Sequence, residues 1–129
     1  MIVRPATNAD LPLINHIMDV CDLAGESVDY TRWDGLVLVA VRQSEIVGFV
    51  HVVPSRPYSI VTHIGVLPEH QKGRAASKLM ESAELLLRSS GYSTWYTFAY
   101  EKETALRDLI TRWGAKESPS MGHIYKRTL

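Results

Sequence analysis

The chain has 129 residues, 46% of them hydrophobic and 22% charged, which is typical of a globular domain and excludes a disordered chain. Basic and acidic residues balance at 14 each, so no basic field predicts a nucleic-acid partner. The single cysteine, Cys21, excludes an internal disulfide and a cysteine-based zinc or redox site. No signal-peptide core or membrane-spanning run is present, and the histidines lack metal-ligand spacing. We therefore expect a cytoplasmic protein without a membrane partner or a metal.

The first predicted elements are a short strand and a helix. Residues 2–4 read as a strand, and apolar side chains then recur at helical spacing at Ile14, Ile17 and Met18. A polar segment, residues 25–34, interrupts this periodicity and is expected to form a loop or an irregular helix.

Three strands follow. Residues 36–41 and 46–53 are apolar and β-branched, and the polar turn between them indicates a hairpin of buried strands. Residues 58–66 form the third strand of this group. The loop after it leads into a helix whose apolar stripe reaches Leu87 and which Gly91 ends in a left-handed conformation.

The remainder predicts another strand, a helix and a closing strand. Residues 94–100 are strand-like, and a helical crossover should place them parallel to the third strand of the group. The next helical stripe includes Ile110 and ends at Gly114, and residues 123–127 alternate as an edge strand does. The sequence thus predicts one α+β domain, residues 1–129, with a mixed sheet.

The most informative segment is residues 66–80, VLPEHQKGRAASKLM, which passes from a strand through a tight loop into an amphipathic helix. It resembles the acyl-coenzyme A loop of the GNAT superfamily of N-acetyltransferases, whose pattern reads V-x-P-x-x-Q/R-x-x-G-x-G/A. The order of elements along nearly the whole chain is also similar to that superfamily. The resemblance implies a GNAT-like mixed central sheet of about six to seven strands, flanked by about four helices.

The start of the helix that follows this loop suits a phosphorylated ligand. The first amides of the helix lack intrahelical acceptors, and the positive end of the helix dipole attracts a pyrophosphate. By resemblance the pyrophosphate belongs to acetyl-CoA, the co-substrate. The predicted binding residues are the strand backbone at Ile64, Gly65 and Val66, and the loop and helix start at Gln71, Lys72, Gly73, Arg74, Ala75, Ala76 and Ser77.

One position departs from the pattern. With Pro68 and Gln71 aligned to the family, Arg74 stands where the first glycine is expected. Its side chain either points outward and adds charge beside a phosphate, or obstructs the ligand. We favour the outward arrangement, because a guanidinium forms paired, charge-assisted hydrogen bonds with phosphate.

Two histidines are candidates for the general base. His63 lies on the strand before the loop, and an imidazole accepts a proton near neutral pH. His51, on the neighbouring strand of the predicted hairpin, is the second candidate, although its alternation with apolar residues also fits a buried structural histidine. A carboxylate acting through water, such as Glu26, is a further alternative.

The general acid is where the chain departs most from its relatives. Many of them carry a tyrosine in the penultimate helix, and the corresponding position here is Ile110, which cannot donate a proton. Tyr96, Tyr100 or Tyr125 could substitute, but tyrosines in strands usually serve packing.

The sequence therefore predicts an N-acetyltransferase that moves an acetyl group from acetyl-CoA to a primary amine of a small molecule or peptide by direct attack. The alternative is a catalytically weak or inactive acyl-CoA-binding or protein-interaction module of the same fold. The acceptor is not readable, since relatives select it with variable segments that correspond here to residues 21–33 and 54–58. A homodimer through the closing edge strand is compatible with residues 123–129 but not required by them.

Overall fold

The computed structural model describes residues 1–21, 35–100, 103–118, 125, 127 and 128. The chain divides into two compact units, Met1–Thr97 and Phe98–Leu129. The expectation of a single domain over residues 1–129 stays a prediction.

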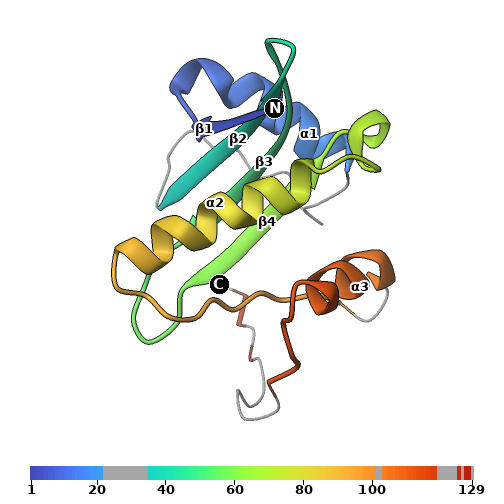
Figure 1. The fold of residues 1–129 in the computed structure, drawn as a ribbon. Coiled ribbons are helices and arrows are strands. Elements are labelled where there is room, and N and C mark those ends of the chain that lie inside the picture. Colours follow the sequence, from blue (N-terminus) through green and yellow to red (C-terminus); the bar gives the residue numbers. More distant parts are fainter. Residues whose placement is uncertain (22–34, 101–102, 119–124, 126, 129) are drawn as a thin grey trace. The chain divides into compact units, whose positions relative to one another are not determined.

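The first unit is built on an antiparallel sheet in the order β1-β2-β3-β4 (Figure 1). Its strands are β1 (Ile2–Pro5), β2 (Leu36–Arg42), β3 (Glu45–Val53) and β4 (Ile60–Val66). The hairpin between β2 and β3 turns through Gln43 and Ser44, both at positive φ, as the two-residue turns that match strand twist require. The predicted hairpin and the strand after it are confirmed. β4 forms one edge of this sheet.

Two helices cover the opposite faces of this sheet. α1 (Leu11–Val20) packs its buried apolar side chains against a cluster that includes Val37, Val39 and Phe49. Because side chains alternate between faces along a strand, Leu38 and Ala40 of β2 turn to the other face, where α2 (Ala75–Ser89) lies. The polar segment before β2, residues 22–34, lies outside the described residues, and with it Glu26.

Gly91 ends α2 as the sequence predicts. Its φ is +86°, in the left-handed region, and the N–H of Tyr92 reaches back to the carbonyl of Leu87 at 2.9 Å. This is the hydrogen-bond pattern of a glycine-capped helix terminus. The turn at Gly91 leads the chain back toward β4 and into the segment that carries Tyr96.

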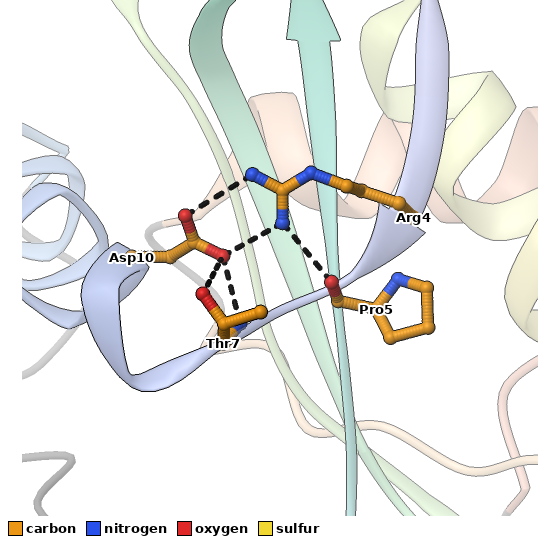
Figure 2. Close-up of polar contacts among 4 residues, drawn as sticks. All are labelled: Arg4, Pro5, Thr7 and Asp10. Atoms are coloured by element: carbon orange, nitrogen blue, oxygen red, sulfur yellow. Dashed lines mark hydrogen bonds and ion pairs between the residues drawn. The ribbon is translucent and has the colours of Figure 1, made fainter.

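A buried carboxylate ties β1 to the start of α1 (Figure 2). Asp10 is 6% exposed, and its carboxylate accepts hydrogen bonds from Nη1 and Nη2 of Arg4 at 2.8 and 3.1 Å. The backbone N–H and hydroxyl of Thr7 donate to the same carboxylate at 2.7 and 3.1 Å. The bond to Arg4 is the main cause that lowers the pKa of Asp10 from 3.8 to about 2.

Replacing Asp10 with asparagine should destabilise the protein by about 2 kcal/mol at neutral pH, because the lowered pKa means that the ionised form is preferred in the folded state. The contribution is complete above about pH 5 and is lost as the pH falls through the folded value of about 2. Urea unfolding of wild type and Asp10→Asn across this range measures it. A difference in stability that did not shrink toward pH 2 would contradict the assignment.

The second unit contains α3 (Thr104–Arg112). The helix ends at Gly114, whose φ is +90°, and the N–H of Ala115 bonds the carbonyl of Ile110 at 3.0 Å. The predicted helix and its glycine terminus are confirmed. Residues 123, 124 and 126 lie outside the described residues, so the closing strand stays a prediction.

The α+β class is confirmed, but the expected number of elements is not. The described residues form four strands and three α-helices, rather than six to seven strands and about four helices. Residues 94–100 are not a strand; they form one parallel bridge, Tyr96 to Ile60. There the N–H of Tyr96 donates to the carbonyl of Ser59, and the carbonyl of Tyr96 accepts from the N–H of Val61. The Thr97 hydroxyl donates to the carbonyl of Val61 at 2.8 Å. A side chain thus occupies the acceptor that a longer ladder would use. Within the described part of the chain, no helix is long and apolar enough to cross a bilayer.

Candidate active site

The loop between β4 and α2 folds as a short series of turns. The N–H groups of His70, Gln71 and Gly73 donate to carbonyls within the loop. The Gln71 side chain also reaches back, and its Nε2 donates to the carbonyl of Val66 at 3.0 Å. These bonds hold the start of α2 against the end of β4.

The loop leaves a group of amide donors without acceptors in the part of the chain that the structure describes. The first bond into the helix is from the N–H of Lys78 to the carbonyl of Arg74, at 2.9 Å. Among the described residues, no acceptor is bonded to the backbone N–H groups that precede Lys78 at this helix terminus, those of Lys72, Arg74, Ala75, Ala76 and Ser77. Such donors, together with the positive end of the helix dipole, suit an anionic ligand. This geometry fits the pyrophosphate of acetyl-CoA.

Two arginines lie at or near this loop, Arg74 and Arg42. Arg74 is exposed, and its side chain makes no hydrogen bond or ion pair with the described residues. Its φ of −101° suits any residue, so the backbone itself has no need of a glycine there. The side chain of Arg42, at the end of β2, approaches the loop at Gly73, since a methyl group on Gly73 would lie 3.9 Å from its Nη1. The sequence does not indicate Arg42, because the approach of the β2 end to the loop depends on the tertiary fold.

The outer edge of β4 offers two more backbone donors. The N–H of Leu67 points to β3, where it bonds the carbonyl of Val47 at 2.9 Å. Backbone groups alternate in direction along a strand, so the N–H groups of Ile64 and Val66 point to the opposite edge, and that of Gly65 points to β3. No strand of the described residues pairs with this edge beyond the bridge at Ile60. A carbonyl group placed along it would find donors.

The two candidate histidines lie side by side. His51 of β3 is directly opposite His63 of β4. His51 also pairs with Val37, which packs against α1, so both rings belong to the face of the sheet that α1 covers. His51 is 7% exposed, whereas His63 is only partly buried. His63 is therefore the more accessible of the two.

A β-bulge adds a third polar side chain. The register shifts after the His51–His63 pair, so that Val52 pairs with Val61 and Thr62 is the extra residue. The Thr62 hydroxyl lies 2.6 Å from His51 Nδ1 and 3.1 Å from His63 Nδ1. In a regular strand, neighbouring residues point to opposite faces. The bulge turns Thr62 toward the histidines, and bulges commonly re-aim side chains beside active sites.

The surroundings of His63 favour the neutral form of its ring. Burial lowers its pKa below 6.5, and the neighbouring His51 adds to the shift. Both effects disfavour the charged ring. His63 is thus a neutral imidazole at physiological pH.

Cys21, just after α1, has no features of a nucleophile. Its Sγ donates to the carbonyl of Val66 at 3.2 Å. Burial raises the pKa of the thiol, so the reactive thiolate is disfavoured. The thiol helps to hold the end of α1 to the end of β4.

The tyrosines offered as substitutes for the acid lie in different surroundings. Tyr96 packs edge-on against Tyr58, with ring centroids 5.1 Å apart. In the second unit, Tyr100 is 74% and Tyr125 is 91% exposed, and Ile110 lies on α3. The structure therefore does not single out a proton donor for the leaving group among the described residues.

Comparison with known proteins connects this geometry to a family. The model of the acetyltransferase (GNAT) domain matches residues 33–114, which is more than half of the chain. The chain belongs to the GNAT acetyltransferase family. The predicted family, the class of acyltransferase and the use of acetyl-CoA are confirmed at this level. No match was found among curated proteins.

Solved structures share the GNAT fold over almost the full length. Aminoglycoside N-acetyltransferase AAC(6')-Iy in complex with CoA is 14% identical, with 98% of this chain and 93% of that one covered and a TM-score of 0.81. AAC(6')-IG from Acinetobacter haemolyticus is 16% identical, with 99% of each chain covered and a TM-score of 0.73. An aminoglycoside acetyltransferase from an uncultured soil metagenomic sample, in complex with sisomicin, is also 16% identical, with 99% and 96% covered and a TM-score of 0.77. At these identities the likeness establishes the fold, and neither it nor the family match supports a non-catalytic module.

Proposed function

We propose that this GNAT protein transfers an acetyl group from acetyl-CoA to a primary amine of a small molecule or peptide, by direct attack of the amine. The observation that carries the proposal is the group of amide donors at the start of α2, those of Lys72 and of residues 74–77, which have no acceptors among the described residues. The edge of β4, with His63 and outward N–H groups on one strand, leads directly into that loop.

Each part of the site has a role in this proposal. Acetyl-CoA supplies the acetyl group as an activated thioester. The amides at the start of α2 would bind its pyrophosphate, with Arg74 and Arg42 adding positive charge. The N–H of Ile64 or Val66 would donate to the acetyl carbonyl oxygen, where negative charge develops during transfer.

His63 would act as the general base. Its neutral ring would take the proton that the amine must lose as the new C–N bond forms, while the C–S bond of the thioester breaks and CoA leaves as a thiolate. Direct transfer is favoured over a covalent acetyl-enzyme because Cys21 is held as a hydrogen-bonded thiol with a raised pKa.

The acceptor is the open part of this proposal. The aminoglycoside acetyltransferases that share the fold favour a small-molecule amine as the first class to test. A lysine-containing peptide is the second class. The cytoplasmic location and the homodimer stay predictions.

Isothermal titration with acetyl-CoA and with CoA tests the cofactor site, and thiol release tests transfer to sisomicin, spermidine and a lysine peptide. We expect micromolar binding that weakens several-fold in Arg74→Ala, with unchanged thermal stability, because this exposed side chain has no partner among the described residues. The control is Arg88→Ala, an equally exposed arginine in the last turn of α2. Absence of heat with either ligand would overturn the proposal.

A further inference from the structure

Three side chains of β3 and β4, on the face of the sheet that α1 covers, form a hydrogen-bonded row. Thr62 stands between the rings, with Oγ1 2.6 Å from His51 Nδ1 and 3.1 Å from His63 Nδ1. The carbonyl of His51, 3.3 Å from Oγ1, is the more distant of two possible acceptors for the hydroxyl proton, the nearer being His51 Nδ1. A hydroxyl has one proton to donate and two lone pairs that accept. The row therefore has a direction.

The distances assign that direction. A hydroxyl donor approaches its acceptor more closely than a ring N–H does. The distance between donor and acceptor atoms is typically about 2.7 to 2.8 Å when a hydroxyl donates and about 2.9 to 3.0 Å when an N–H donates. The short contact to His51 Nδ1 fits Thr62 as the donor, and the longer one to His63 Nδ1 fits Thr62 as the acceptor. His51 then has its proton on Nε2, and His63 has its proton on Nδ1.

The tautomer of His63 matters because only an unprotonated nitrogen can accept a proton. With Nδ1 protonated and bonded to Thr62, the lone pair of His63 lies on Nε2, at the far side of the ring from the threonine. When Nε2 accepts a proton, the Nδ1–H bond to Thr62 remains and becomes charge-assisted. No other proton has to move.

We propose that Thr62 is a positioning residue that holds His63 in the Nδ1–H tautomer, with the hydroxyl of Thr62 in turn oriented by the buried ring of His51. This assignment rests on the proposed function, in which His63 is the base. It separates the roles of the two histidines: His63 accepts the proton, and His51 acts through Thr62. The bulge at Thr62 is what brings the hydroxyl between them.

The tautomers are measurable without any substrate. Long-range ¹H–¹⁵N spectra of the full-length protein, assigned with His51→Asn and His63→Gln variants, distinguish Nδ1–H from Nε2–H rings. We expect Nδ1–H at His63 and Nε2–H at His51 in the wild type and in Thr62→Ser, which keeps the hydroxyl. In Thr62→Val, which keeps the branched shape, the Nδ1–H form of His63 should decline. A wild-type His63 with its proton on Nε2 would overturn the proposal, whether or not the valine variant folds.

Kinetics then tests the consequence. With the best acceptor of the amine panel, Thr62→Val should lower kcat roughly 10- to 100-fold, a part of the about 10²- to 10⁴-fold that a general base contributes. The KM for acetyl-CoA should stay unchanged, and Thr62→Ser should retain most of the rate. A serine variant as slow as the valine variant would contradict the role of the hydroxyl. If the wild type transfers no acetyl group to any amine, the proposed function fails, while the spectra still accept or reject the arrangement at Thr62.

Discussion

Replacing His63 with glutamine is expected to reduce kcat about 100- to 1,000-fold while acetyl-CoA binds with an unchanged Kd. A general base contributes about 10²- to 10⁴-fold to a rate, and glutamine keeps a polar side chain of similar length but cannot take the proton. Steady-state kinetics with the best acceptor amine and isothermal titration with acetyl-CoA measure the two quantities separately. The matched control is His16→Gln, an exposed histidine on α1, which should change neither.

The pH dependence of the wild type belongs to the same experiment. Because burial and His51 lower the pKa of His63 below 6.5, the neutral form of the ring predominates at neutral pH. The acidic limb of kcat/KM should therefore have an apparent pKa below 6.5 and should be absent in His63→Gln. A glutamine variant with wild-type kcat and the same limb would assign the base elsewhere.

The second large effect is expected at Ala76, near the start of α2. An aspartate there should weaken acetyl-CoA binding about 100-fold, which corresponds to roughly 2.7 kcal/mol, because a carboxylate close to a phosphate costs several kcal/mol at the effective dielectric of a protein surface. The same substitution should leave the protein as stable as the wild type, or raise its stability by about 0.3 to 1 kcal/mol, since acidic residues in the first turn complement the helix dipole.

This opposition between stability and binding makes Ala76→Asp informative. Titration with acetyl-CoA and thermal unfolding are measured on the same preparations. Ser93→Asp adds the same charge at an exposed position after α2 and should bind acetyl-CoA as the wild type does. Unchanged binding by Ala76→Asp would mean that the pyrophosphate is not held at this helix terminus, and would remove the main support for the cofactor site.

Local patterns along the chain were sufficient to locate most of the elements. The apolar period of α2, the turn residues before β3 and the glycines after α2 and α3 each act on their nearest neighbours, so the predicted hairpin and the glycine termini at Gly91 and Gly114 are found in the structure. The expected strand over residues 94–100 failed for the opposite reason. Strand formation requires partners from elsewhere in the chain. Here the Thr97 hydroxyl, rather than a backbone N–H, donates to the carbonyl of Val61.

The candidate site divides in the same way. The loop of residues 66–80 carries its own information, because its tight turn and the helix that follows it leave amide donors free irrespective of the rest of the fold. The sequence also placed His63 and His51 on neighbouring strands. It did not reveal Thr62, since a threonine next to a histidine in a regular strand would point to the other face.

By itself, then, the sequence determined the family, the strand-loop-helix segment and the choice of acetyl-CoA as co-substrate, because these depend on residues adjacent in the chain. Only the tertiary structure decided that His51 and His63 face each other, that Thr62 stands between them, and that Arg42 approaches Gly73. Each of these depends on strand register, on the bulge and on the closure of a hairpin. Register and bulges are set by how side chains pack across the sheet, a property that no single segment contains.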